Sequence, residues 1–486
     1  MTAMTSHKPK DTAYYIHSLI ALFMMFGIGF LPPAEPLTPL GMKVLGIFIG
    51  LLYAWTFVEM IWPSLVGLIA LGLTGYAPMK TVFASGFGND LVLLVFFLLI
   101  FAAYLDESGL NRAIANWFVS RKIGIGRPWI FSTLILLASY VLAATISFFA
   151  SIVLMWSIFY EISDTLGFKR RDNYPAMMLI GIVFAAMLGL AIFPYKTIQV
   201  MVMGSLEKIS GITVDFISFT LISFIISAIC LLLYILTCKL IFRPDVAPLK
   251  QMNDEQFAHL RGIGLTAPQK IAAVFLVTFI LLMFLPSLIP ADTWLGNILK
   301  LTGTTGSAAL VVAVASFLRI DGKRVLDFGR MISRGMLWDI IILFAVTMPL
   351  GSALESDETG VMAFIVHLLD PLFSHTSGTL FIALFILIAG ILTQFAHNLV
   401  LAAVLLPILY SFSLELGANP AVGAVLLAFT VGVAIVTPGS SAQGAMIHGN
   451  KQWISTKQAY LYGITTFIIT SAVLLLIGLP LSDLLL

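Results

Sequence analysis

The chain has little charge and almost no cysteine. Only 10% of its 486 residues are Asp, Glu, Lys or Arg, whereas soluble domains carry about 25%. Its two cysteines, Cys230 and Cys238, share one apolar segment without metal-ligand spacing, which argues against a disulfide framework. A phosphate-binding loop, a His/Cys/Glu metal cluster and a basic patch for nucleic acid are also missing, so we predict no enzyme activity, no cofactor and no nucleic-acid partner.

Long apolar runs dominate instead. The chain is 60% hydrophobic, and runs of about 20 apolar residues recur, the length that crosses a hydrocarbon core of about 30 Å. We therefore predict an all-α polytopic membrane protein. Lys and Arg gather in alternate loops, which predicts a cytoplasmic N-terminus and a bacterial inner membrane. The expected spans are 14–31, 41–57, 59–75, 89–105, 173–209, 216–240, 270–289, 304–319, 336–354, 421–450 and 458–480.

Two apolar segments, 129–166 and 379–414, do not fit as ordinary spans. Each holds a polar patch at its centre, Thr145-Ile146-Ser147 in the first and 393–398 in the second. Basic loops flank the first segment at both ends, while no Lys or Arg flanks the second. We therefore expect two re-entrant hairpins that enter from opposite sides of the membrane, with their tips covered by protein or by a watery cavity.

A helix broken at a proline follows each hairpin, at Pro194 within 173–209 and at Pro438 within 421–450. The prolines are 244 residues apart (438 − 194), and the hairpin tips, Ser147 and His397, are 250 apart (397 − 147). These intervals predict two inverted repeats, with about 11 transmembrane helices besides the two hairpins, two of them broken. The expected division is a leader with the first helix (1–40), the first repeat (41–240), a cytoplasmic linker (241–269) and the second repeat (270–486).

Short motifs in these repeats resemble a known family. Gly86-Phe87-Gly88-Asn89 is similar to its Gly-Phe-x-Asn lead-in, and Thr437-Pro438 to its broken-helix motif. Ser147-Phe148-Phe149 and His397-Asn398-Leu399 lie where its two Ser-Asn-Thr tips would fall. The family is that of the divalent anion/sodium symporters of the ion transporter superfamily, which carry dicarboxylates, citrate and sulfate.

This resemblance implies a secondary active transporter of small anions, with di- or tricarboxylates as the expected substrates. It also implies a homodimer in membrane lipid, elevator-type alternating access, and sodium sites at the tips and breaks, here near Asn398 and Thr437. Unpaired N–H groups at half-helix N-termini suit an anion, and unwound carbonyls suit a hard cation.

The first repeat departs from the family pattern. Phe148 and Phe149 replace the Asn and Thr of the tip, which suggests selection of an apolar or aromatic anion over succinate. Lys196 lies two residues past Pro194, where its ammonium could replace a bound sodium; the carrier would then exchange anions or couple to protons. The alternative is that Lys196 extends to the surface and pairs there. His397 is a second possible cation, or else a neutral histidine bonded to a facing helix.

Ser and Thr hydroxyls also bond to the backbone within membrane helices, so the tip residues have a structural alternative as well. The predicted substrate- or ion-binding residues are Thr145, Ser147, Phe148, Pro194, Lys196, Thr197, Thr393, Gln394, His397, Asn398, Thr437, Pro438, Ser440, Ser441 and Gln443. Alternative functions are a cation/proton or arsenite-type carrier of the same superfamily, a channel, or a non-transporting membrane protein. The cation carriers use membrane-buried carboxylates, and we expect no Asp or Glu at mid-depth here.

Overall fold

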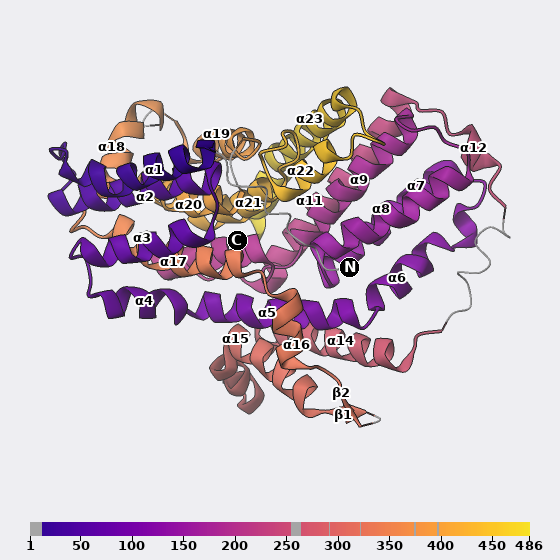
Figure 1. Cartoon of the computed structure of the whole chain (residues 1–486), viewed down its shortest axis with the longest axis horizontal. Helices are drawn as coiled ribbons and strands as arrows, with labels where there is room; N and C mark the ends of the chain where they lie inside the picture. Colours follow the sequence, from indigo (N-terminus) through magenta and orange to yellow (C-terminus); the bar gives the residue numbers. More distant parts are fainter. Residues whose placement is uncertain (1–11, 254–263, 291, 321, 374–375, 396–397) are drawn as a thin grey trace.

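The chain folds into a bundle of helices (Figure 1). The computed structural model describes residues 12–253, 264–290, 292–320, 322–373, 376–395 and 398–486. Within these ranges ten helices are long and apolar enough to cross a membrane, and a pair bent by 42°, α4 (Met79–Phe87) and α5 (Asp90–Glu107), makes an eleventh. The predicted all-α polytopic fold is confirmed.

The first half of the chain contains the segments expected as the first repeat. Its other elements are α1 (Thr12–Gly27), η1 (Ile28–Phe30), α2 (Pro39–Phe57), α3 (Ile61–Leu73), α6 (Leu110–Val119), η2 (Lys122–Gly124), α7 (Pro128–Thr145), α8 (Phe148–Thr165), α9 (Asn173–Leu190), α10 (Thr197–Ser210), α11 (Phe216–Thr237) and η3 (Cys238–Phe242). Asp215 caps α11, since its carboxylate accepts hydrogen bonds from the amides of Ile217 and Ser218 at 3.0 and 2.9 Å.

The second half repeats this order of elements, with α18 to α23 following one another as α6 to α11 do. Its elements are α12 (Ala247–Lys250), α14 (Ala267–Leu288), α15 (Trp294–Phe317), β1 (Arg319–Ile320), β2 (Lys323–Arg324), α16 (Phe328–Gly335), α17 (Trp338–Glu355), α18 (Val361–Phe373), α19 (Gly378–Leu392), α20 (Asn398–Glu415), α21 (Pro420–Gly432), α22 (Ala442–Gly449), α23 (Thr456–Val473), η4 (Leu474–Gly478) and α24 (Leu479–Leu485). Strands β1 and β2 form a short antiparallel hairpin that pairs Arg319 with Arg324.

Some expected loops contain helices instead. The stretch between the spans expected at 59–75 and 89–105 contains α4, and the stretch before the span expected at 304–319 is helical from Trp294, where α15 starts. Thr293 caps this helix by accepting from the amide of Gly296 at 3.0 Å. Gly303, with φ 62° and ψ −176°, allows a kink in α15, because a residue with a side chain rarely adopts this backbone conformation.

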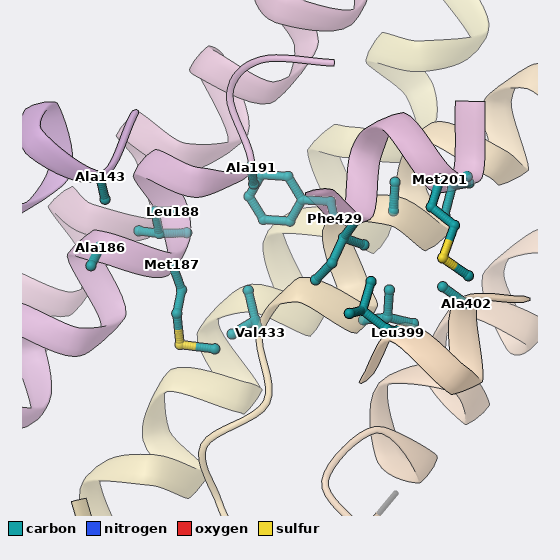
Figure 2. Packing of buried hydrophobic residues seen from close by; sticks show 14 of the residues in the cluster. Ala143, Ala186, Met187, Leu188, Ala191, Met201, Leu399, Ala402, Phe429 and Val433 are labelled. Atoms are coloured by element: carbon teal, nitrogen blue, oxygen red, sulfur yellow. The ribbon is translucent and has the colours of Figure 1, made fainter. Parts of the chain in front are cut away.

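The two halves are interlocked rather than side by side. α10 packs between α20 and α21 of the other half, and α17 packs against α3 and α4. Figure 2 shows this junction, where apolar side chains from α7, α9, α10, α20 and α21 gather in one layer. All of α21 and nearly all of α9 are buried. These two helices, apolar on every side, therefore form the centre of the molecule.

The outer helices are apolar on their exposed sides. Val274, Val277 and Leu281 of α14 are 64%, 56% and 53% exposed. Large exposed apolar surfaces are unusual for monomers in water. Together with the lengths of the helices, this surface indicates that α14 faces lipid.

Candidate functional site

Both predicted hairpin tips are places where one helix stops and another starts. In the first half α7 ends at Thr145 and α8 begins at Phe148, with Ile146 and Ser147 outside helical geometry. In the second half α19 ends at Leu392 and α20 begins at Asn398. The non-helical residues leave backbone groups that the surrounding protein or a ligand must satisfy.

Both proline-centred breaks are present as well. α9 and α10 are separated by residues 191–196, and α21 and α22 by residues 433–441. Pro194 is buried in the first break, whereas Pro438 is exposed at the second. Both broken helices therefore have the interruption expected from the sequence.

Tips and breaks from both halves meet at one cavity of about 340 Å³. The predicted site residues that line it are Thr145, Ser147, Phe148, Lys196, Thr197, Asn398 and Gln443. The first residues of α8, α10, α20 and α22 all contribute to its wall, so four helix N-termini converge there. Each such terminus carries unpaired N–H groups and partial positive charge, which favours an anion.

Lys196 supplies a full positive charge to this cavity. It precedes the first residue of α10, and its ammonium lies 5.9 Å from the centre of the Tyr195 ring. No described residue forms an ion pair or hydrogen bond with the Lys196 ammonium. Lys196 is half-buried, and a charge removed in part from water is costly without a partner, so a bound anion would be its natural partner.

Gln394 lies at the second tip but does not line the cavity. Its amide nitrogen donates to the carbonyl of Val433 at 2.9 Å, and its amide oxygen accepts from the amides of Ile435 and Val436 at 3.2 and 3.1 Å. The side chain thus braces the unwound backbone of the second break against α19. In this structure Gln394 has the structural role that was the alternative to ligand binding.

Its neighbours bond to the backbone in the same way. Thr393 donates to the Val431 carbonyl at 3.3 Å, and the Thr437 hydroxyl donates to the carbonyl of Gln394. Ser440 donates to the Thr437 carbonyl at 2.7 Å. These three side chains and Pro438 shape the second break from outside the cavity wall.

Ser441 starts the half-helix after the second break. Its hydroxyl accepts from the amide of Gly444 at 3.0 Å, as an N-cap does, and donates to the Ala434 carbonyl at 2.5 Å. Ser441 therefore positions Gln443, which does line the cavity. His397, the remaining predicted site residue, lies outside the described residues.

The groups around the expected sodium site near Asn398 and Thr437 make hydrogen bonds within the protein. The Asn398 side-chain oxygen accepts from the amide of Leu399 at 2.9 Å, and the Thr437 hydroxyl donates to the carbonyl of Gln394. The carbonyls of Val433 and Ala434 in the same break accept hydrogen bonds from Gln394 and Ser441. A sodium ion at this position stays a prediction from the sequence.

Several cavity residues had not been predicted. Asp339, in the first turn of α17, lines the cavity and is exposed. No motif surrounds Asp339 in the sequence. The one feature that marked it there is its position near the start of an expected span. The apolar lining from α5 and α14, such as Phe101 and Phe279, has no signal in the sequence beyond hydrophobicity.

Long apolar helices, two interrupted hairpins and two broken helices around a central cavity define a membrane transporter. Comparison with known proteins identifies the family. Residues 50–434 match the family CitMHS, described as citrate transporter, and the chain belongs to this family. The family resemblance seen in the sequence is therefore confirmed as far as membership of the citrate transporter family.

Relatives and solved structures agree with this class. The chain is 24% identical over 459 residues to an uncharacterized transporter of Haemophilus influenzae, covering 93% of each chain. It is 30% identical over 140 residues to an uncharacterized transporter of Synechocystis sp., or 29% of this chain and 22% of that protein. Its fold is similar to that of the Alcanivorax borkumensis YdaH transporter, with TM-score 0.55, 13% identity and coverage of 97% and 96%. It is also similar to Neisseria gonorrhoeae MtrF, which is described with a class of antimetabolite efflux pumps, with TM-score 0.58, 15% identity and coverage of 96% and 94%.

Proposed function

We propose that this transporter moves a small organic anion by secondary active, alternating-access transport. The observation that carries the proposal is the ammonium of Lys196, which forms no ion pair or hydrogen bond with a described residue, in a cavity where four helix N-termini converge. Carboxylates are the anions that the family description suggests, and di- or tricarboxylates are the first compounds to test.

We infer that Lys196 binds the carboxylate directly. Ser147 and Thr197, also in the cavity wall, have hydroxyls placed to add hydrogen bonds. Asn398 and Gln443 bring amide groups from the second half, so the anion would be held between the two halves. Charge-assisted hydrogen bonds of this kind are stronger than neutral ones.

We further propose that transport does not require sodium. Lys196 supplies a permanent positive charge at the first break, and Gln394 occupies the Val433 carbonyl at the second. Transport would then be driven by anion exchange or by proton coupling. His397 stays a prediction from the sequence as a group that could carry a proton near neutral pH.

The larger arrangement is also part of the proposal. The recurrence of the same element order in both halves supports inverted repeats. A rigid-body elevator movement between the membrane faces follows from the family resemblance. A homodimer in a bacterial inner membrane, with the N-terminus in the cytoplasm, follows from the family resemblance and from the basic loops.

Counterflow in proteoliposomes tests this function. Vesicles are loaded with unlabelled succinate, citrate or another carboxylate, and entry of the labelled compound is followed with and without sodium. Saturable exchange that ignores sodium supports the proposal. Exchange that needs sodium would reject the role of Lys196 and Gln394 in replacing the ion, and steady conductance would indicate a channel.

A further inference from the structure

The cavity has two unlike walls. The hairpin tips and helix breaks contribute its polar groups. Much of the remaining lining is apolar and comes in part from α5 and α14, including Val95, Leu98, Phe101 and Phe279. A ligand that fills the cavity therefore needs one polar end and one apolar end.

Charge is as unevenly placed as polarity. Among the described residues that line the cavity, Lys196 is the one cation and Asp339 the one anion. Lys196 compensates a single carboxylate. A second or third carboxylate would find no further cation in this lining, and Asp339 would repel it.

Aromatic rings extend along the apolar side. The ring centroids of Tyr195 and Phe279 are 5.1 Å apart at an interplanar angle of 83°, and those of Phe279 and Phe101 are also 5.1 Å apart. At the first tip Phe148 and Phe149 add two more rings, 4.8 Å apart in an edge arrangement. Aromatic side chains pack favourably edge to face with a further ring.

The size of the cavity agrees with a ligand larger than a short diacid. Its volume of about 340 Å³ lies at the lower end of the ~300–1,000 Å³ found for pockets that hold drug-sized ligands. Such a volume accommodates a ring together with a carboxylate.

We propose that the transported substrate is a monoanion, with one carboxylate at Lys196 and an apolar, ring-bearing body against Phe101 and Phe279. The inference rests on the transport function proposed above and narrows its substrate class. The amides of Asn398 and Gln443 allow a neutral polar substituent, such as a hydroxyl, next to the carboxylate.

Counterflow with mandelate, an aromatic hydroxy acid with one carboxylate, tests the inference on the purified full chain. Proteoliposomes hold equal concentrations of unlabelled mandelate, succinate or citrate, and labelled mandelate is added outside. In parallel assays labelled succinate or citrate is added to vesicles that hold the same anion, and protein-free liposomes give the leak. We expect internal mandelate to drive at least tenfold more uptake than succinate or citrate. Rapid self-exchange of succinate or citrate without mandelate exchange would overturn the inference but leave the transport function standing. Failure of all three anions to exchange would overturn both.

A pair of variants at the first tip provides a matched comparison. Phe148→Asn adds a polar group to the apolar lining of the cavity, whereas Phe148→Leu removes the ring and keeps the apolar surface. We expect Phe148→Asn to shrink the preference for mandelate over succinate several-fold more than Phe148→Leu does. An unchanged ratio in Phe148→Asn, in protein that still exchanges mandelate, would contradict selection for an apolar body by the ring at the first tip.

Discussion

Replacing Lys196 with methionine should separate activity from stability. Methionine has a similar length but no charge, so the anion loses its partner. Removing one member of a buried charge pair costs about 2–5 kcal/mol. At tenfold per ~1.4 kcal/mol, anion binding should weaken by roughly 30-fold to several thousand-fold. The substrate-free protein should respond in the opposite direction, because the variant removes a half-buried charge that has no ion pair or hydrogen bond among the described residues.

The assay is a pair of measurements on the same purified protein. Counterflow in proteoliposomes gives the loss of exchange, and the thermal midpoint in detergent gives the change in stability. We expect exchange by Lys196→Met to fall to the leak level, while its midpoint without substrate equals or exceeds that of the original chain. Added substrate should raise the midpoint of the original chain only.

Two further variants serve as controls. Lys196→Arg keeps the charge and should retain part of the exchange. Lys208→Met removes a lysine from the same helix, where the ammonium bonds to Ser352 at 2.7 Å and to the Met348 carbonyl at 3.3 Å, and should retain exchange. Full exchange by Lys196→Met would refute the role of this lysine. A large loss of stability in Lys196→Met would show instead that the ammonium has a structural partner.

Three other changes test the elements around the cavity. Gln394→Ala should lower the thermal midpoint by several degrees, since each buried backbone group that loses its hydrogen bond costs roughly 1–3 kcal/mol. An unchanged midpoint would show that the Gln394 side chain does not stabilise the second break. Ser441→Ala removes the cap of α22, and a cost of about 1 kcal/mol is expected in chemical denaturation, with Ser440→Ala for comparison. Burial raises the pKa of Asp215, but hydrogen bonds, led by that from Ser287, outweigh burial and hold the pKa below its usual value. The ionised carboxylate therefore stabilises the fold above its unfolded pKa of about 3.9 and loses this effect as the pH falls through the lower folded pKa; Asp215→Asn should be less stable at pH 7, and stability equal to the original chain there would contradict this.

The tips and breaks could be predicted because their signals are local. Pro194 and Pro438 interrupt apolar runs, and a proline inside a helix removes a hydrogen bond wherever the helix lies. The function of each polar side chain near them could not be predicted in the same way. Gln394 and Gln443 are both glutamines beside an interruption, yet one bonds to backbone and the other lines the cavity. The direction of each side chain depends on which helix packs next to it.

Contacts between residues far apart in the sequence explain why some features of the cavity could not be predicted. Asp339 reaches the cavity because α17 runs against helices of the first half, far from it in sequence. The start of α15 was missed because its cap, Thr293, precedes glycine and asparagine residues that usually favour loops. Local composition suggested a loop, and one capping side chain together with the kink at Gly303 was enough to produce a helix.

The brace formed by Gln394 has a consequence for the order of events in a transport cycle. Where a break is held by a bound ion, the ion must arrive before the site is complete, and its absence prevents the empty carrier from moving. Here a side chain holds the second break at all times, so the site is assembled before any solute arrives. The barrier to an empty return would then come from Lys196, whose ammonium is costly to carry through a low-dielectric environment until an anion neutralises it. Under the function proposed above, such a carrier would return loaded, which would tie the inward passage of one anion to the outward passage of another.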